Sequence, residues 1–321
     1  MNNTSPTSPV DGLHHVTAIA SDAADNFRFW THVLGQRFVK KTVNFDDPGT
    51  YHLYYGTRLG APGTAMTFFP FPGVPRGRRG IGETAATRFS VPTSSLAFWA
   101  GWLEENGAPV REGENRFGDK SLITADPDGT VIALIERDGD TREPWATDAI
   151  HADHAIRGFE GVTLRLHDGA RTRDVLTQAL GYREAGSEGQ AIRYISTGGS
   201  HAGTVDLIMS PGAPPAGGGA GSVHHVAFAV PDDEAHVLAR EIIKGMGIPV
   251  TPFIDRNYFH SIYFREPGGV LFEIATNNPG FTMDEPEETL GQGLKLPPQH
   301  EHLRAHLEAT LKPLPQQGSD S

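Results

Sequence analysis

The sequence predicts an α+β protein built from four βαβββ modules, which pair into two domains with mixed, open-barrel sheets. Three observations support this prediction. A plan of strand, helix, closing glycine and further strands recurs along the chain, and two similar glycine turns precede the last strand of a unit. Each unit holds about 55 to 70 residues, which is too few to bury a sheet face alone. Each unit therefore needs a neighbouring unit.

Every unit opens with a short strand, at residues 13–20, 86–92, 161–166 and 224–231. Polar residues that favour a helix start follow each strand, and a glycine closes each amphipathic helix. Further strands complete the unit. The apolar residues expected on the buried side of the helices are, unit by unit, Phe27, Trp30 and Leu34; Leu96, Trp99 and Leu103; Val175, Leu176 and Leu180; and Leu238 and Ile242.

Two turns with the sequences Pro-Asp-Gly, at 127–129, and Pro-Gly-Gly, at 267–269, have the composition of β-hairpin turns. The expected organisation is a disordered N-terminus at 1–11, an N-terminal pair of modules at 12–140, a C-terminal pair at 155–282, and a C-terminal extension with a short helix at 283–321.

Composition limits the classes of function. The formal net charge of -12 argues against nucleic acid or an anionic membrane surface as a partner. The chain has no cysteine, which excludes disulfides, iron–sulfur clusters and cysteine nucleophiles. The N-terminal segment lacks the basic and apolar parts of a secretory signal, and no apolar run is long enough to span a membrane. We therefore expect a cytoplasmic protein.

Glu273 is the first candidate for chemistry because it interrupts an apolar strand. Alternation along residues 270–276 places Leu271, Glu273 and Ala275 on one face and apolar residues on the other. An ionised carboxylate in this position must reach water or bind a cation, since burying it alone would cost several kcal/mol.

Two His-His pairs are the candidate partners of Glu273. His14 and His15 lie in the opening strand of the first unit, and His224 and His225 lie in that of the fourth. Alternation directs the two histidines of a pair to opposite faces, so one histidine of each pair can share a cavity with Glu273.

Alignment of the four units leaves only three ligand-type residues at the equivalent positions. Ala86 and Gly161 take the histidine position in the second and third units. Ala133, Thr67 and Leu207 take the position of the glutamate, and neither Glu136 nor Asp206 is expected in register with it. Two histidines and one carboxylate with open positions form the facial triad of non-haem Fe(II) oxygenases. Catalytic zinc enzymes also use such a set, so these residues do not choose between iron and zinc.

Four strings, GLHHVTAIA, FPFPG, DRNYFHSIYFREPGGVLFEIAT and NNPGF, resemble the ring-cleaving hydroquinone dioxygenase branch of the vicinal oxygen chelate superfamily. The resemblance extends over residues 12–314. It implies the vicinal oxygen chelate fold, and Fe(II), with Mn(II) as the alternative, bound by His15, His225 and Glu273. The implied substrates are a small aromatic diphenol and O₂, and homo-oligomers are common in this family.

The resemblance also implies residues around the metal. Tyr263 and Arg256 match an active-site tyrosine and a cavity arginine of that branch. His14, Thr17 and His224 match polar positions near the ligands, although alternation alone directs His14 and His224 to the opposite face. The implied roles are stabilisation of negative charge by Arg256, a hydrogen bond to oxygen from Tyr263, and proton transfer by a histidine.

Other functions remain open at this point. A catechol could replace the hydroquinone as the substrate of extradiol cleavage. A glyoxalase-type lyase or isomerase would use Zn²⁺ or Ni²⁺ and usually a second glutamate, and the position that could supply one is Ala133. A drug-binding module of the same superfamily would commonly lack the metal triad.

Overall fold

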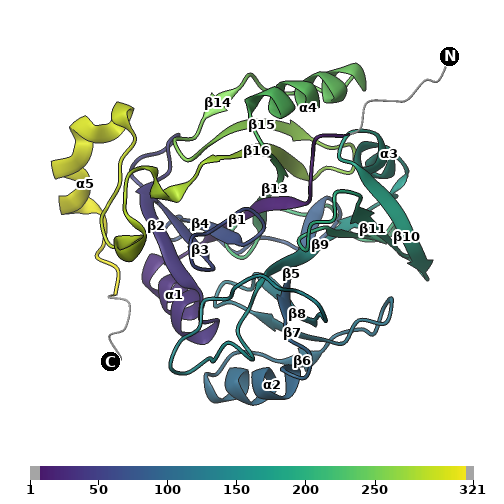
Figure 1. Cartoon of the computed structure of the whole chain (residues 1–321), viewed down its shortest axis with the longest axis horizontal. Coiled ribbons are helices and arrows are strands. Elements are labelled where there is room, and N and C mark those ends of the chain that lie inside the picture. The colour runs from purple at the N-terminus through teal and green to yellow at the C-terminus, as the bar shows by residue number, and fades with distance from the viewer. Residues whose placement is uncertain (1–7, 316–321) are drawn as a thin grey trace.

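The structure is a computed structural model, and it describes residues 8–315. Within this range four modules with the order βαβββ follow one another, as the sequence predicts (Figure 1). The first module contains β1 (Leu13–Ala20), α1 (Ala23–Arg28) with a π-helical turn (Phe29–Val33), β2 (Arg37–Val43), β3 (Tyr51–Gly56) and β4 (Ala65–Pro70). The second contains β5 (Glu83–Val91), α2 (Leu96–Glu105), β6 (Arg111–Glu112), β7 (Ser121–Ala125) and β8 (Val131–Glu136).

The second half of the chain repeats this plan and adds an extension. The third module contains β9 (Gly158–Leu166), α3 (Ala170–Gln178), β10 (Tyr182–Glu188), β11 (Ala191–Ser196) and β12 (Thr204–Met209). The fourth contains β13 (Val223–Val230), α4 (Asp233–Gly245), β14 (Ile254–Asp255), β15 (Phe259–Arg265) and β16 (Leu271–Pro279). The extension contains three short 3₁₀ helices (Phe281–Met283, Glu287–Thr289 and Pro298–Leu303) and α5 (Arg304–Thr310).

The strands form two eight-stranded mixed sheets, and each sheet combines two modules. One sheet has the order β14-β15-β16-β13-β1-β4-β3-β2, and the other has the order β10-β11-β12-β9-β5-β8-β7-β6. The first module therefore shares a sheet with the fourth, and the second shares one with the third. This pairing corrects the expected one, in which each module paired with its neighbour along the chain. The opening strands decide the partners: β1 pairs with β13, and β5 with β9, both antiparallel.

The register of the sheets corrects one detail of the module alignment. In the first sheet Glu273 lies beside Ala227, which is two residues after His225. In the second sheet the corresponding residue of β9 lies beside Asp206. Asp206, and not Leu207, therefore occupies the position of Glu273 in the third module. An alignment error of one residue exchanges the two faces of a strand, so it placed Asp206 on the wrong face.

Arginines neutralise the carboxylate at this position of the second sheet. Asp206 accepts hydrogen bonds from Arg193 at 2.7 Å and from Arg88 at 2.9 Å. Arg88 also contacts Glu160 at 2.5 Å and Asp119 at 2.6 Å, and all of these side chains are buried. The second sheet thus has an ion-pair network where the first sheet has the histidines and Glu273.

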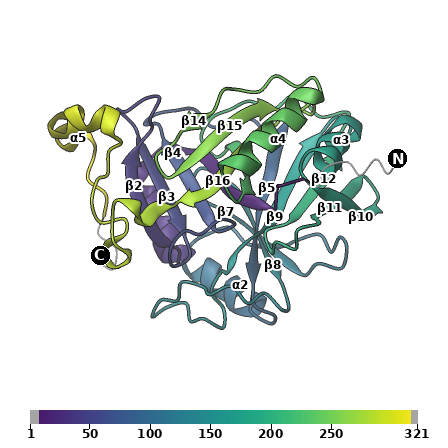
Figure 2. The same ribbon diagram turned by 45° about the horizontal axis from the view of Figure 1, so that its top comes forward.

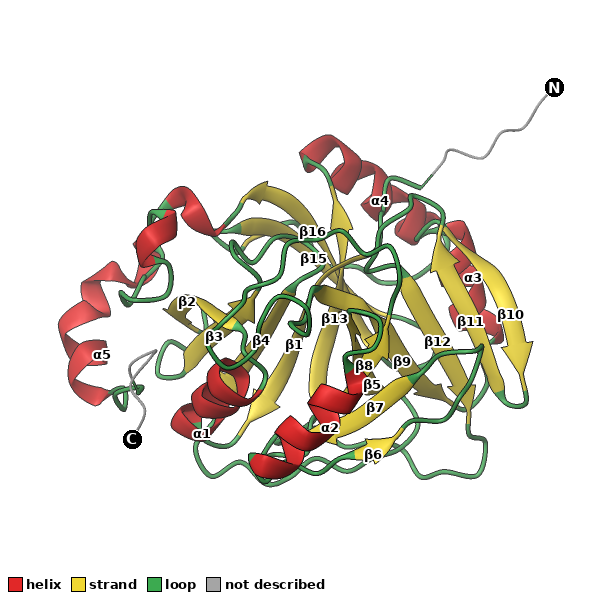
Figure 3. Ribbon diagram, turned by 60° about the horizontal axis from the view of Figure 1, so that its bottom comes forward, coloured by secondary structure: helices red, strands yellow, loops and turns green. Residues whose placement is uncertain are grey.

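The four module helices lie on the outside of the curled sheets (Figure 3). The apolar stripes predicted for the first three helices are buried apart from Leu96, which is partly buried. In α4 the prediction is wrong for Leu238, which is 39% exposed, whereas Ile242 is partly buried against the core; the fully packed residues are His236, Ala239 and Ile243. A hydrogen bond of 3.0 Å between His236 Nε2 and the Ile274 carbonyl holds this face of α4 against β16.

The N-terminal end of the described chain lies beside α3, and the C-terminal extension lies at the other side of the molecule, next to β2 (Figure 2). Of the segment expected to be disordered, residues 1–7 lie outside the described residues. Residues 8–11 contact the third module, where the Ser8 hydroxyl donates to the Ala179 carbonyl at 2.8 Å, so the expectation is wrong for them. The extension lies beside β2, where the fully buried Lys40 pairs with Asp284 and Glu285 at 2.8 and 2.9 Å. No helix in residues 8–315 is both long and apolar enough to cross a membrane.

Candidate metal centre

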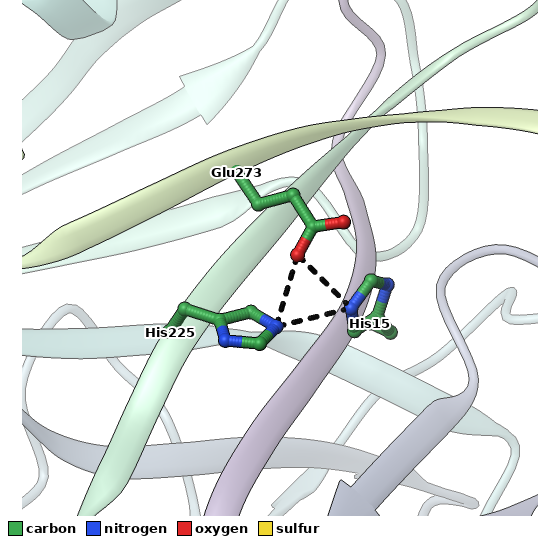
Figure 4. A group of neighbouring side chains, drawn as sticks. All are labelled: His15, His225 and Glu273. Carbon is green, nitrogen blue, oxygen red and sulfur yellow. Dashed lines mark hydrogen bonds and ion pairs between the residues drawn. The ribbon is translucent and has the colours of Figure 1, made fainter. Parts of the chain in front are cut away.

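The side chains of His15, His225 and Glu273 converge on one point in the first sheet (Figure 4). Nε2 of His15 and Nε2 of His225 lie 3.3 Å apart. Oε2 of Glu273 lies 3.4 Å from the His15 nitrogen and 2.9 Å from the His225 nitrogen. All three side chains are buried. The structure thus brings together the three residues that the sequence predicts as ligands.

Three adjacent strands, β1, β13 and β16, carry these side chains. β1 and β13 pair antiparallel with His15 opposite Ala227, and β13 and β16 pair parallel with Ala227 beside Glu273. His225 is two residues before Ala227 and so faces the same side of the sheet. Residues far apart in the chain therefore meet because the opening strands of the first and fourth modules are neighbours.

The second histidine of each pair contacts the first. Nδ1 of His14 lies 2.9 Å from Nδ1 of His15, and Nδ1 of His224 lies 2.8 Å from Nδ1 of His225. Burial and the neighbouring His15 lower the pKa of His14 to about 3. Burial and the neighbouring His225 lower the pKa of His224 to about 4, although the residue keeps an exposed side. Neutral His14 and His224 can accept protons of His15 and His225 at Nδ1, which leaves both Nε2 lone pairs directed at Glu273.

The arrangement of these atoms fits a cation. In this tautomer the two Nε2 atoms and Oε2 of Glu273 are all acceptors, and Oε2 makes no hydrogen bond of normal geometry among residues 8–315. Ligand atoms about 2.0–2.2 Å from a metal and at right angles are about 3 Å apart. The separations of 2.9 to 3.4 Å match that value.

Glu273 also has a buried partner on the far side of its carboxylate. The Ser261 hydroxyl, on the neighbouring strand β15, donates to Oε1 of Glu273. This hydrogen bond leaves Oε2 as the oxygen that faces the two histidines. Sequence reasoning missed Ser261, because its proximity to Glu273 depends on the pairing of β15 with β16.

Tyr263 and Arg256 lie together beside the three residues. Nε of Arg256 donates to the Tyr263 hydroxyl at 3.1 Å, and the Tyr263 ring contacts that of His225 with 5.7 Å between centroids. Burial raises the pKa of Tyr263 well above its usual value, so this phenol stays protonated. Burial alone would lower the pKa of Arg256, but Tyr263 and Asp46 raise it, and the net effect is a raised pKa. The guanidinium of Arg256 therefore keeps its positive charge. The structure thus places a cation and a hydroxyl donor at the candidate centre.

A cavity of about 240 Å³ opens onto the centre. Among the predicted site residues, the ones that line it are His15, His225, Arg256, Tyr263 and His224. His14 instead lines a separate cavity of about 150 Å³. Thr17 is fully buried and its hydroxyl bonds the Thr67 hydroxyl at 2.7 Å. The cavity wall also includes residues that sequence reasoning missed, among them Asn44, Asp46, His52, Tyr54 and Phe69.

Similar proteins point to one class of chemistry. The sequence model of the glyoxalase/bleomycin resistance protein/dioxygenase superfamily matches residues 12–134 and 158–274. A Bacillus subtilis protein named "Putative ring-cleaving dioxygenase MhqO" is 43% identical over 302 residues, which cover 94% of this chain and 96% of that protein. The chlorohydroquinone/hydroquinone 1,2-dioxygenase of Sphingobium indicum is 36% identical over 311 residues, which cover 94% of this chain and 96% of the relative.

Solved structures show the same architecture. The crystal structure of a protein described as a putative dioxygenase from Bacillus subtilis superposes with a TM-score of 0.92 at 42% identity, covering 96% of this chain and 98% of that one. Glyoxalase I from Zea mays gives a TM-score of 0.62 at 18% identity, covering 83% of this chain and 92% of the other. At that identity the second likeness concerns the fold alone.

Proposed function

Because the chain belongs to the glyoxalase/bleomycin resistance protein/dioxygenase superfamily, we propose that it is a ring-cleaving dioxygenase that uses Fe(II) to open a hydroquinone-type ring with O₂. The observation that carries the proposal is the convergence of His15, His225 and Glu273 at the end of a cavity. Two histidines and one carboxylate leave positions of a metal free for two further molecules. A ring-cleaving dioxygenase needs room for a diphenol and for O₂.

Each protein group has a defined task in this proposal. His15, His225 and Glu273 would hold Fe(II), which would supply Lewis acidity and redox capacity to the reaction of a diphenol with O₂. Arg256 offsets negative charge that develops on the diphenol or on oxygen. Because Arg256 donates to the Tyr263 oxygen, the Tyr263 proton is free to point into the cavity and to donate to a bound oxygen. His14 and His224 orient the two histidine ligands through Nδ1.

The two histidines and the carboxylate also suit Mn(II) and Zn²⁺. The cavity has room for a small aromatic molecule, and its size does not select one particular diphenol. Metal identity and substrate are therefore tested together. The purified chain is stripped of metal, loaded anaerobically with Fe(II), Mn(II), Zn²⁺ or Ni²⁺, and supplied with hydroquinones or catechols in the presence of O₂. We expect oxygen uptake with Fe(II) and a hydroquinone, and incorporation of oxygen into a ring-opened product.

His225→Ala tests the site itself. We expect this variant to lose both bound metal and oxygen uptake, because one of three ligands is gone. His260→Ala is the matched control, since His260 lies on β15 of the same sheet but contacts Asp233 at 2.6 Å outside the centre. Activity with Zn²⁺ or Ni²⁺ without oxygen uptake would instead indicate a lyase or isomerase, and retained activity in His225→Ala would refute the assignment.

A further inference from the structure

One wall of the cavity carries a chain of hydrogen bonds that ends at a tyrosine. The hydroxyls of Thr17 and Thr67 lie 2.7 Å apart, and the Thr67 hydroxyl lies 2.9 Å from Nε2 of His52. Nδ1 of His52 lies 2.8 Å from the Tyr54 hydroxyl. His52 and Tyr54 line the cavity, whereas the two threonines are fully buried in the wall. The chain of bonds fixes the ring of His52 from one side and the Tyr54 hydroxyl from the other.

These bonds leave only the Tyr54 hydroxyl with capacity for a ligand. Both nitrogens of His52 already have protein partners, so the imidazole cannot bind a further group. A phenol hydroxyl has one proton and two lone pairs, and His52 occupies only one of these. Tyr54 can therefore accept a hydrogen bond from a molecule in the cavity or donate one to it, depending on the tautomer of His52.

We propose that Tyr54, oriented by His52, recognises the second hydroxyl of the diphenol, the one that does not bind at the metal centre. This inference deepens the proposed function and rests on it. Tyr54 would contact the substrate, and His52 would act through Tyr54 as a positioning residue. The site then selects diphenols over aromatic molecules that carry a single hydroxyl.

The position of Tyr54 in the sheet supports this assignment. Tyr54 lies on β3, which β4 separates from β1, so its backbone is about 10 Å from the strand that carries His15. Tyr263, by contrast, pairs with Glu273 on neighbouring strands and contacts His225. Tyr263 and Arg256 thus lie beside the three candidate ligands, and Tyr54 lies on the opposite wall of the cavity.

The charge state of this wall suits a neutral hydroxyl. Burial raises the pKa of Tyr54 well above its usual value and lowers the pKa of His52 well below its usual value, so both groups are neutral near pH 7. These two neutral groups would offer a carboxylate hydrogen bonds but no positive charge of their own. Phe69 completes the wall, with its ring centroid 4.3 Å from that of His52, and offers an apolar surface to an aromatic ring.

Equilibrium binding gives a test that does not depend on turnover. Hydroquinone and phenol are titrated anaerobically into the Fe(II)-loaded protein and its Tyr54→Phe variant by calorimetry. A lost hydrogen bond of about 1.4–2.8 kcal/mol corresponds to a factor of about 10 to 100 in affinity. We expect Tyr54→Phe to weaken hydroquinone binding by this factor and to change phenol binding by less than about twofold.

Tyr55→Phe is the matched control. Tyr55 follows Tyr54 on β3, is fully buried, and donates its hydroxyl to Asn26 at 2.9 Å on the opposite face of the sheet. This variant should keep the preference for hydroquinone over phenol. His52→Gln adds a second test, because the amide can keep both partners of the imidazole. The His52→Gln variant should retain more of the preference for hydroquinone over phenol than His52→Phe does. This comparison remains informative if Tyr54→Phe does not fold.

The outcomes separate this inference from the proposed function. Equal weakening of hydroquinone and phenol by Tyr54→Phe, or no weakening of either, would overturn the role of Tyr54. A wild-type protein that shows no preference for hydroquinone over phenol would also overturn it. If the preference depends on Tyr54 but no diphenol supports oxygen uptake, the recognition of the second hydroxyl stands and the dioxygenase proposal falls.

Discussion

Ser261 positions Glu273, one of the three proposed metal ligands. The Ser261 hydroxyl donates to Oε1 of Glu273, and both side chains are fully buried. This bond fixes the carboxylate so that Oε2 faces His15 and His225. Ser261→Ala removes the donor, adds no bulk and leaves the three candidate ligands in place. We therefore expect weaker metal binding in a protein that still folds.

The size of the effect follows from the character of the bond. A hydrogen bond to a charged group contributes about 1.5–3 kcal/mol, and about 1.4 kcal/mol corresponds to a factor of ten in affinity. Because the bond is already present without metal, this energy sets an upper limit of about 150-fold on the loss of metal affinity. Loss of other groups that orient metal ligands typically costs a factor of about 10 to 100. We expect a loss within this range for Ser261→Ala.

The assay is an anaerobic competition for Fe(II) between the protein and a chelator of known affinity. Ser121→Ala is the matched control, because Ser121 occupies the position of Ser261 in the second module and pairs with Ile135 on β8, with Ala133 in the place of Glu273. The control should bind metal like the wild-type protein. Unchanged affinity in Ser261→Ala, or an equal loss in both variants, would refute the reasoning.

Two further predictions concern stability. Arg88→Met leaves the buried carboxylates of Glu160 and Asp206 without one partner, so we expect a loss of about 3–5 kcal/mol in the free energy of unfolding by urea; a loss below about 1 kcal/mol would contradict this. Burial raises the pKa of Asp140, but hydrogen bonds from Arg142 outweigh it and lower this pKa to about 2, against about 3.9 in the unfolded chain. This contribution is complete above about pH 4 and is lost as the pH falls towards about 2. Asp140→Asn should remove that part of the pH dependence of the free energy of unfolding. If this free energy changes with pH in the same way in both proteins, Asp140 does not supply the contribution.

The sequence was sufficient to find the candidate ligands because they recur at equivalent positions of a repeat. His15 and His225 follow another histidine in the opening strands of their modules, and Glu273 interrupts an apolar strand. Such local patterns survive without knowledge of how the modules are arranged. The number of modules and their βαβββ order were predictable for the same reason.

The arrangement of modules depends on contacts that local patterns do not encode. Each opening strand can pair with that of any other module, and chain order favoured the neighbour, whereas β1 pairs with β13. The position of Asp206 was wrong by one residue because no Pro-Asp-Gly or Pro-Gly-Gly turn, of the kind that anchors the alignment of the second and fourth modules, precedes β12. The exposed Leu238 reflects a hydrogen bond of His236 to the sheet, which no hydrophobic pattern reveals.

The residues of the cavity wall were the hardest to predict. His52 and Tyr54 lie two residues apart on β3 and so share one face of the strand. A single polar residue in a strand often has a purely structural role, so the sequence does not mark these two as part of a binding site. Only the order of β1, β4 and β3 places Tyr54 across the cavity from Tyr263. A sequence pattern can therefore point to candidate metal ligands, whereas the folded sheet decides which residues line the cavity.

Anomalous diffraction from crystals of the Fe(II)-loaded protein, grown without oxygen, tests the central claim most directly. The ligand assignment predicts one strong iron peak enclosed by Nε2 of His15, Nε2 of His225 and Oε2 of Glu273, and no peak in the His225→Ala variant. An iron peak at another place in the protein, or no peak in the loaded wild-type crystals, would contradict the assignment.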